Sequence, residues 1–411
     1  MYKTINGMKD IMPPEISKWH FAEEKIKKIF KFYNYKEVRT PVLEFTALFK
    51  RGVGESTDIV EKEMYTFEDR NGKSLSLRPE GTASVVRAYI QSKAYAVSPL
   101  TKFYYMGQMY RHERPQKGRY RAFNQVGAEF FGPTEPASDF EILQMVDDIL
   151  KEVNLKNYKF HINNIGCNEC RPNHKKALIE YFTPHKDNLC NDCRRRLESN
   201  PLRIMDCKVD ACKKISENAP KISDYYCDSC RNHNKELVSF LENSDINYVF
   251  DDKVVRGLDY YVKTTFEVKV SGDILGNQNT IIGGGRYNNL VKELGGPDIS
   301  AVGFAIGMER LILALGDEVK KDLLDYAVIV LGKENIHHGL KLAFSLRKKG
   351  FVVDLDYRFG SLKSQMRWAN KNGAKKVIII GENEVKKGVF TEKDMITSKQ
   401  TEKTFKEIYG E

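Results

Sequence analysis

The sequence predicts an α+β protein: an antiparallel sheet with helices, interrupted by a cysteine-rich insertion and followed by a small α/β domain. Three observations lead to this prediction. Before residue 320, strand-like runs follow one another without strict alternation with helices. All eight cysteines lie between Cys167 and Cys230. Beyond Leu324, strand-like and helix-like segments alternate regularly.

Hydrophobic spacing and turn residues divide the first part of the chain. Lys18–Tyr33 carries apolar residues at helical spacing and predicts an amphipathic helix, whereas Tyr35–Glu44 is extended around Pro41. We expect these elements next: a turn at RGVGEST from Arg51, strands Glu63–Phe67 and Ser74–Leu77 joined by DRNG, a helix opening near Gly81, strands on both sides of an arginine-rich hairpin, a helix from about Ala137 to Val153 and a strand at His161–Ile165.

The second part of the chain is read in the same way. Strands are expected from Tyr248, through Thr265–Val270 and Thr280–Ile282, ending at the segment GGGRY, before a helix at Met308–Leu315. The tail alternates DYAVIVLG, a helix at Asn335–Lys349, FVVDLDY, a helix at Leu362–Asn372 and KKVIIIG, which predicts a small parallel α/β domain. We therefore expect a core of residues 1–165 and 246–320, an insertion of residues 166–245 and a tail domain of residues 325–411.

Length, composition and charge indicate the number of domains, the expected location and the kinds of partner. With 411 residues and 41% hydrophobic side chains, the chain has room for two or three domains with real cores. No stretch reaches the apolar length of a membrane span, and the first residues lack the pattern of a secretory signal, so we expect a cytoplasmic protein that contacts no membrane. The net charge of +10 suits a nucleic-acid partner but is also common in proteins that have none.

The segment from Phe103 to Gly132 is the most informative stretch of the chain. Two strand-like runs flank RHERPQKGRYR, which holds Arg111, Arg114, Arg119 and Arg121. Guanidinium groups bind phosphate bidentately and stay charged, so this hairpin suits a polyanion; a solvated, charged hairpin is the alternative. The sequence has neither a P-loop nor a GxGxxG motif after a strand, so side chains would hold the phosphates of any bound nucleotide.

The cysteines predict a metal-binding insertion. They form three CxxC pairs and one looser pair: Cys167 with Cys170, Cys190 with Cys193, Cys227 with Cys230, and Cys207 with Cys212. Nineteen residues separate the first two CxxC pairs and fourteen separate the looser pair from the third, and both gaps suit tetrahedral Cys₄ zinc sites. Such a structural zinc would hold together an insertion with little core of its own. Eight free thiols in a reducing compartment are the alternative.

Four further segments combine with the hairpin into a family resemblance. They are SLRPEGTA from Ser76, VVRGLDYYVKTTFE from Val254, GGGRYNNLV from Gly283 and AVGFAIGMERLILAL from Ala301. In this order they resemble the histidyl-tRNA synthetases, a family of class II aminoacyl-tRNA synthetases, over essentially the whole chain. YKEVRTPVLE resembles the first class II motif, the hairpin the second and GFAIGMERLILAL the third, while RGLDYY and GGGRY resemble the two signatures peculiar to the histidine enzymes.

The resemblance implies a fold and a reaction. The fold is a class II antiparallel-sheet catalytic domain with a C-terminal anticodon-binding domain, assembled as a homodimer through the first motif. The enzyme would join the carboxylate of L-histidine to the α-phosphorus of ATP, release pyrophosphate accompanied by Mg²⁺, and transfer the histidyl group to the 3′ end of tRNA(His). Negative charge builds up on the α-phosphoryl oxygens in the transition state, so fixed cations there accelerate the reaction most.

The resemblance also implies site residues, position by position. Arg111 and Arg256 are the expected catalytic residues, one on each side of the α-phosphate, and Glu113 and Arg310 complete the ATP site with Arg111. The expected histidine-binding residues are Glu80, Thr82, Gln125, Glu129, Arg256, Tyr260 and Tyr261; Glu129 and Tyr261 would meet the two ring nitrogens. The expected tRNA contacts are Arg114, Gln116 and Arg119 at the acceptor end, and Arg358 and Lys363 at the anticodon, the last two being ordinary surface charges in the alternative interpretation.

Two non-enzymatic interpretations are the rivals of this hypothesis. A regulatory paralogue of these synthetases binds histidine without charging tRNA, but it generally lacks the C-terminal domain and the arginine of RGLDYY, both of which this chain keeps. The second rival is a nucleic-acid-binding module with an inactive synthetase fold, and the intact set of arginines argues against it.

Overall fold

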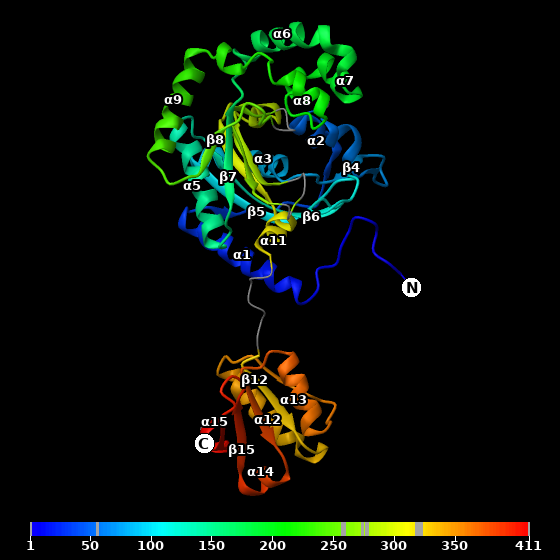
Figure 1. Cartoon of the computed structure of the whole chain (residues 1–411), viewed down its shortest axis with the longest axis vertical. Coiled ribbons are helices and arrows are strands. Elements are labelled where there is room, and N and C mark those ends of the chain that lie inside the picture. The colour runs from blue at the N-terminus through cyan, green and yellow to red at the C-terminus, as the bar shows by residue number, and fades with distance from the viewer. Residues whose placement is uncertain are drawn as a thin grey trace. The chain divides into compact units, whose positions relative to one another are not determined.

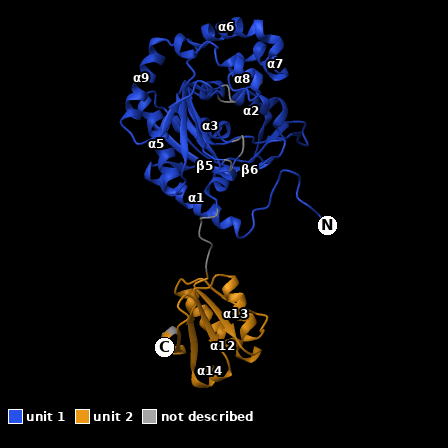
Figure 2. Cartoon of the chain, in the orientation of Figure 1, with its two compact units in different colours: residues 1–319 blue, residues 320–411 orange. Residues whose placement is uncertain are grey.

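The computed structural model describes residues 2–54, 57–255, 260–272, 275, 279–316 and 324–409. The chain forms two compact units, residues 1–319 and residues 320–411 (Figures 1 and 2). The first unit holds a large antiparallel sheet, its helices and the cysteine-rich insertion, and the second holds a smaller sheet with helices. The predicted α+β class is therefore confirmed.

An eight-stranded sheet is the frame of the first unit, in the order β1-β5-β6-β11-β10-β9-β7-β8. Neighbouring strands are antiparallel except for the edge pairs β1–β5 and β7–β8, which are parallel. The strands are β1 (Lys36–Glu37), β5 (Thr101–Tyr110), β6 (Ala122–Phe131), β7 (Tyr158–Asn164), β8 (Tyr248–Phe250), β9 (Val262–Val270), β10 (Thr280–Tyr287) and β11 (Ala301–Gly307).

Alternation along β6 separates the two faces of this sheet. Val126, Ala128 and Phe130 point into the larger hydrophobic core, which α1 (Glu15–Phe32) and α5 (Pro136–Glu152) cover together with α11 (Met308–Leu315). The residues between them, such as Glu129, face the opposite side, because successive side chains of a strand alternate. A second core lies on that side, under α3 (Thr82–Gln91).

Smaller elements complete the core of the first unit. A three-stranded sheet has the order β2-β4-β3 and packs near α2. These elements are β2 (Leu43–Phe45), α2 (Thr46–Val53), the π-helix η1 (Ile59–Glu63), β3 (Thr66–Glu68), β4 (Ser74–Leu77), α4 (Ala94–Val97) and α10 (Leu290–Glu293).

The insertion leaves the large sheet after β7 and returns to it at β8. It is mostly helical, and Figure 1 shows α6, α7 and α8 gathered at one end of the first unit. Its elements are α6 (Arg171–Phe182), η2 (Thr183–Asn188), α7 (Asn191–Ser199), η3 (Pro201–Ile204), α8 (Asp210–Ser216), η4 (Ile222–Tyr225) and α9 (Asp228–Glu242).

The second unit is a five-stranded sheet in the order β13-β12-β14-β15-β16. Strands β13, β12 and β14 are parallel, as predicted, whereas β15, which the sequence analysis did not predict, pairs antiparallel with both β14 and β16, so the sheet as a whole is mixed. A short turn joins β15 to β16, and a connection of that length permits only a hairpin. The elements are β12 (Tyr326–Val330), η6 (Lys333–Asn335), α12 (Ile336–Lys348), β13 (Val353–Leu355), α13 (Leu362–Lys371), β14 (Lys376–Ile380), α14 (Glu382–Lys387), β15 (Val389–Asp394), β16 (Gln400–Thr404) and α15 (Phe405–Tyr409).

Two predictions in the first unit need correction. The strand before GGGRY does not end there, because β10 runs through the glycines to Tyr287 and pairs with β9 and β11 on both sides. The turn expected from Arg51 begins as the last turn of α2. Among the described residues, none of the helices has the length and apolar character needed to cross a bilayer.

Candidate active site

One face at the centre of the large sheet carries glycines on neighbouring strands. Gly285 pairs with Gly303, and Gly303 pairs in turn with Glu129 on β6. A Cβ at Gly303 would lie 2.0 Å from Glu129 Oε2, and a Cβ at Gly127 would lie 2.4 Å from the hydroxyl oxygen of Tyr105. The glycines therefore let these polar side chains lie flat against the sheet, where a bound molecule can reach them.

Glu129 occupies the inner end of this face and is 1% exposed. Thr82 Oγ1 donates a 2.7 Å hydrogen bond to its Oε1, and the Tyr287 hydroxyl donates a 2.6 Å hydrogen bond to its Oε2. Desolvation raises the pKa of Glu129 to about 8 despite these two donors. The carboxyl group therefore changes its protonation state near neutral pH, as functional carboxyl groups often do.

Glu80 lies beside this carboxyl at the start of α3. Its oxygens accept hydrogen bonds from the backbone N–H groups of Thr82, at 2.6 Å, and Ala83, at 2.8 Å. Burial raises the pKa of Glu80, and the charge of Arg111 opposes that shift. Two carboxyl groups thus share a small, buried space, next to the guanidinium of Arg111.

Three buried polar atoms, one on β6 and two near the carboxyl groups and Thr82, form no well-aligned hydrogen bond among the described residues. They are Gln125 Oε1 and the hydroxyl oxygens of Tyr105 and Tyr260. Burial, and then the charges of Glu80 and Glu129, raise the pKa of both phenols well above the usual value, so both stay neutral donors. The Tyr260 ring lies 4.7 Å from that of Tyr261. Because buried polar atoms are rarely left unpaired, this cluster points to a small polar ligand.

Guanidinium groups converge at the outer end of the same face. Arg310 lies in the first turn of α11, and its Nε and Nη1 donate to the carbonyl oxygens of Gly118, at 2.9 Å, and Thr280, at 2.7 Å. Desolvation, followed by the charges of Arg119 and Arg111, lowers the pKa of Arg310 to about 10. Three positive charges held this close suit a polyanion such as the phosphates of a nucleotide.

The hairpin loop fixes the other members of the outer cluster. Arg111 Nε donates a 2.8 Å hydrogen bond to the carbonyl oxygen of Pro79, and its guanidinium lies 5.3 Å from the ring centroid of Phe123. Glu113 forms a 3.0 Å ion pair with Arg119 and lies 3.8 Å from Arg111. These contacts hold the guanidinium groups in place before any ligand binds.

Most of the expected site residues lie at one end of this face or the other. The outer cluster contains Arg111, Glu113, Arg119 and Arg310, and the inner cluster contains Glu80, Thr82, Glu129, Tyr260 and Tyr261. Gln125 lies on β6, four residues before Glu129, and its Oε1 is buried. Arg256 lies outside the described residues. Arg114 and Gln116 are exposed on the hairpin loop, whereas Arg119, expected among the tRNA contacts, is paired with Glu113.

The two expected anticodon residues lie in the second unit. Arg358 and Lys363 are both exposed, and Arg358 makes a bidentate ion pair of 2.7 Å per bond with the buried Asp356. This pairing lowers the pKa of Asp356 and fixes the direction of the guanidinium.

Sequence reasoning missed three residues of the site. Tyr105 and Tyr287 supply hydroxyls to the inner cluster, and both lie inside segments that the sequence analysis singled out, so their position in the motifs was the available signal. Glu309 precedes Arg310 and accepts hydrogen bonds from the backbone and side-chain nitrogens of Asn124, at 2.8 and 3.1 Å. Desolvation raises the pKa of Glu309 to about 7.

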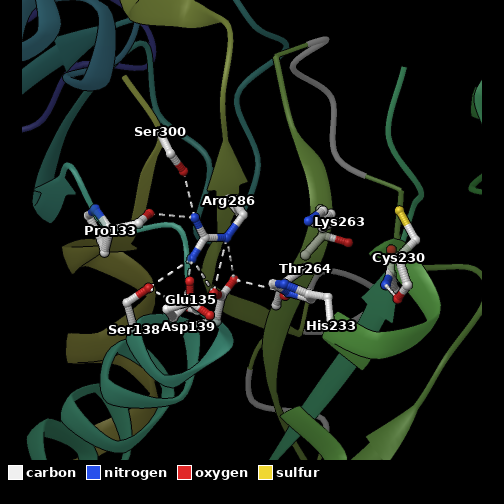
Figure 3. A network of polar contacts seen from close by, with 12 residues as sticks. Pro133, Glu135, Ser138, Asp139, Cys230, His233, Lys263, Thr264, Arg286 and Ser300 are labelled. Carbon is white, nitrogen blue, oxygen red and sulfur yellow. Dashed lines mark hydrogen bonds and ion pairs between the residues drawn. The ribbon is translucent and has the colours of Figure 1, made fainter. Parts of the chain in front are cut away.

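The arginine of GGGRY, Arg286, fixes the strand β10 that carries the glycines. Arg286 is 1% exposed and forms an ion pair with Asp139 of α5, while its Nη1 donates to Pro133 O, at 2.7 Å, and Ser300 Oγ, at 2.6 Å (Figure 3). Every nitrogen of the guanidinium is engaged, so Arg286 locks β10 to α5 and holds the glycines of β10 in register.

The cysteines form two clusters whose pairing differs from the one that the sequence gaps suggested. One cluster contains Cys167, Cys170, Cys227 and Cys230, and the other contains Cys190, Cys193, Cys207 and Cys212. The nineteen- and fourteen-residue gaps therefore separate different clusters. The reason is topological: the insertion starts and ends at the neighbouring strands β7 and β8, so its first and last CxxC pairs meet.

Known proteins share both units of this chain. The family model described as histidyl-tRNA synthetase matches residues 7–169 and 208–311, and that of the anticodon binding domain matches residues 325–411. The chain is 48% identical over 404 residues to the histidine–tRNA ligase of Halothermothrix orenii, covering 97% of this chain and 96% of that relative. It is 48% identical over 399 residues to that of Aquifex aeolicus, covering 97% of each. The crystal structure of apo S. aureus histidyl-tRNA synthetase superposes with a TM-score of 0.83 at 35% identity, covering 100% of this chain and 99% of that one.

Proposed function

The chain belongs to the histidyl-tRNA synthetase family, and we propose that it is a histidine–tRNA ligase, which activates L-histidine with ATP and transfers the histidyl group to the 3′ end of tRNA(His). The observation that supports this most strongly is the glycine-lined face. It joins a guanidinium cluster at one end to a cluster of buried polar side chains at the other. Nucleotide and amino acid bound at the two ends would meet with the carboxylate beside the α-phosphate.

Activation requires two anions to approach each other. A carboxylate oxygen of histidine attacks the α-phosphorus, the bond from that phosphorus to the bridging oxygen breaks, and pyrophosphate leaves with the electron pair. We assign the α-phosphate to Arg111 and the γ-phosphate to Arg310, and we place Arg256 opposite Arg111 by its position in RGLDYY. Arg111 and Arg310 are held by backbone carbonyl groups, so little reorganisation is needed as charge develops.

Mg²⁺ fits the same end of the site. Glu113 forms an ion pair with Arg119 and lies 3.8 Å from Arg111, and Glu309 directly precedes Arg310 in α11, so we assign both carboxyl groups to the ATP end of the site. Carboxylate oxygens are the protein ligands that Mg²⁺ prefers, and the ion would neutralise the pyrophosphate.

The buried polar side chains of the inner cluster suit the imidazole ring of histidine. This ring offers a polar nitrogen at each of two separated edges, and we assign those edges to Glu129 and to Tyr261. Glu80, Thr82 and Gln125 would hold the α-amino group, with Tyr260 completing the wall. An apolar competitor would leave these buried groups unpaired, which a site of this kind penalises by a factor on the order of 10⁴.

Contacts with tRNA are assigned to both units. Arg114, Gln116 and Arg119 on the hairpin loop would meet the acceptor end, and Arg358 and Lys363 would meet the anticodon. In this division of labour, residues 1–165 and 246–320 form the catalytic core, residues 166–245 the insertion and residues 325–411 the anticodon-binding domain.

The proposal extends to assembly, location and metal content. Val42 and Leu43 of the first motif, Phe45 just after it and Phe67 of β3 are between 39% and 56% exposed, and exposed apolar residues of this kind support a homodimer. We further propose a cytoplasmic location and structural Zn²⁺ in the cysteine clusters.

A two-step assay tests the proposed function. The purified chain is expected to catalyse histidine-dependent exchange between ATP and labelled pyrophosphate, and then to acylate tRNA(His). Histidine binding without exchange, in protein that is folded by circular dichroism, would favour a regulatory role instead.

A further inference from the structure

We propose that the insertion holds two zinc ions with different roles, one of which clamps the base of the insertion to the histidine pocket. The base site is formed by Cys167, Cys170, Cys227 and Cys230. The tip site is formed by Cys190, Cys193, Cys207 and Cys212. The family model skips residues 170–207, which hold Cys170, Cys190, Cys193 and Cys207, whereas Cys167, Cys212, Cys227 and Cys230 lie in the matched ranges, so each site combines skipped and matched residues.

The sulfur positions fit a mononuclear tetrahedral ion in each site. Within each group all four sulfurs lie within 4.8 Å of one another. Cys167 Sγ lies 3.6 Å from Cys170 Sγ and 3.7 Å from Cys227 Sγ, and Cys190 Sγ lies 3.9 Å from Cys207 Sγ. Four sulfurs around one zinc at about 2.3 Å form a tetrahedron whose edges are about 3.8 Å.

Backbone donors reinforce this assignment. The N–H group of Cys227 points at Cys170 Sγ, at 3.1 Å, and the N–H group of Cys190 points at Cys212 Sγ, at 3.3 Å. Such N–H donors stabilise the negative charge of ligating thiolates. All eight cysteines are free thiols; Cys170, Cys193, Cys207, Cys212 and Cys230 are buried, and the other three are half-buried.

The base site lies where the chain enters and leaves the insertion. Cys167 and Cys170 follow β7 directly, whereas Cys227 and Cys230 open α9, which leads back to β8. One ion there would tie both ends of the insertion together. The tip site draws its ligands from within the insertion, between α7 and α8, where a small apolar cluster provides most of the packing.

Direct contacts join the base site to the histidine pocket. Arg171, next to Cys170, donates to the backbone carbonyl oxygens of Tyr261 and Ile165. On the other ligand pair, Asn164 Nδ2 donates to Cys230 O at 3.3 Å. The base site therefore holds, through one neighbour, the backbone of the tyrosine assigned to the imidazole.

A second connection runs through α9. His233 lies one turn after Cys230, and its Nε2 lies 2.7 Å from Thr264 Oγ1 on β9 and 3.8 Å from Asp139 Oδ1. Asp139 in turn pairs with Arg286, which anchors the glycine-bearing strand β10 (Figure 3). Loss of the base ion would free the start of α9 and loosen this support.

The tip site contacts the core differently. Arg196 and Arg203 reach Asp58 at 3.3 and 3.2 Å, and this carboxylate lies at the start of η1 rather than in the pocket. Val255, next to the expected catalytic Arg256, packs in the same apolar cluster as Cys193, Cys207 and Cys212. Loss of the tip ion is nevertheless expected to disturb histidine binding less than loss of the base ion, because Arg171, beside Cys170, binds the backbone of Tyr261 directly.

Zinc content tests the pairing on the whole protein. Chain purified without added metal is expected to contain two zinc ions, measured by inductively coupled plasma mass spectrometry. The variant Cys170→Ser/Cys230→Ser removes two ligands of one site and should keep one ion, whereas the matched Cys170→Ser/Cys193→Ser removes one from each and should keep none. The proposal would be overturned if the two variants lost the same number of zinc ions, or if Cys170→Ser/Cys193→Ser kept more zinc than Cys170→Ser/Cys230→Ser. Iron in place of zinc, or a zinc content well below one per folded chain, would also overturn it.

Two further readouts keep the test decisive if a variant folds poorly. Zinc X-ray absorption on the unmutated chain is expected to show four sulfurs at about 2.3 Å, and nitrogen or oxygen ligands or disulfides would contradict the assignment.

In ATP–pyrophosphate exchange, which rests on the proposed function, Cys170→Ser/Cys230→Ser should raise KM for histidine at least tenfold. Cys193→Ser/Cys207→Ser should change it less than twofold. Equal effects of the two variants would refute the clamp, whereas no exchange by the unmutated chain would refute the proposed function and leave the zinc counts standing.

Discussion

Thr82 Oγ1 lies 2.7 Å from Glu129 Oε1, and this hydrogen bond joins the first turn of α3 to the centre of β6. The hydroxyl of Tyr287 binds the other oxygen from β10 at 2.6 Å. A carboxyl group whose pKa is about 8 is thus held between donors from separate elements. We infer that the pocket is organised around Glu129, which is largely protonated at pH 7 and gains a charged partner when an imidazolium enters.

Replacement of Glu129 by Gln is expected to weaken histidine binding. The amide keeps the shape but loses a charge-assisted hydrogen bond, which contributes about 1.5–3 kcal/mol. KM for histidine in ATP–pyrophosphate exchange should therefore rise roughly 10- to 150-fold, with a smaller change in KM for ATP. Glu293→Gln, an exposed change on α10, is the control, and an unchanged KM in Glu129→Gln would show that Glu129 does not contact the amino acid.

Stability should depend on pH through the same carboxyl group. The pKa of Glu129 is about 8 in the folded chain and about 4.5 when unfolded, so the folded state binds the extra proton between these values. This contribution is fully present below pH 4.5 and is lost as pH rises through 8. The Tm of the unmutated chain should therefore fall more steeply between pH 5 and 8 than that of Glu129→Gln. Glu80 and Glu309 also have raised pKa values but are common to both proteins, and parallel Tm curves would contradict the assignment.

Substitution of Gly303 tests whether the close approach of the Glu129 carboxyl group to the sheet is needed. A Cβ there would lie 2.0 Å from Glu129 Oε2 and 2.5 Å from Ala128 O, so Gly303→Ala must displace the carboxyl group or the strand. We expect a loss of about 1–3 kcal/mol in the free energy of unfolding, together with a raised KM for histidine. Gly307→Ala on the same strand meets nothing nearer than 3.9 Å and is the control for Tm. If the two substitutions lower Tm equally, the close packing at Gly303 is not what the structure indicates.

The second unit should affect only the tRNA step. Arg358 is bound to Asp356 on one edge and exposes its other edge, which leaves donors for a nucleotide. Arg358→Ala and Lys363→Ala are expected to raise KM for tRNA(His) in aminoacylation, with exchange of ATP and pyrophosphate unchanged. Losing phosphate or base contacts costs binding but not activation. A matching fall in both reactions would show that these residues act through folding instead.

Local patterns in the sequence predicted the elements that depend on neighbouring residues. Lys18–Tyr33 and Ala137–Val153 differ by only a few residues from α1 and α5, because their apolar faces repeat at helical spacing. The hairpin of β5 and β6 follows from two strand-like runs around a turn.

Long-range pairing was not accessible in the same way. Gly303 lies opposite Glu129 only because β11 pairs with β6 in one register, and no spacing within either segment specifies that register. The cysteine clusters illustrate the same limit, since Cys170 joins Cys227 across the whole insertion rather than the nearer Cys190. The third motif identified Arg310 as a site residue. Its hydrogen bond to the carbonyl oxygen of Gly118 joins α11 to the hairpin loop, and no pattern in either segment indicates that contact.

The central claim is that guanidinium groups from separate segments act on one nucleotide. The most direct test is histidine-dependent ATP–pyrophosphate exchange by Arg111→Lys, Arg256→Lys and Arg310→Lys, with the exposed Arg70→Lys as control. Lysine keeps the charge but loses the planar fork. The account predicts a fall in kcat/KM on the order of 100-fold for each cluster variant and no change for Arg70→Lys. Exchange at the unmutated rate in Arg111→Lys and Arg310→Lys would contradict it.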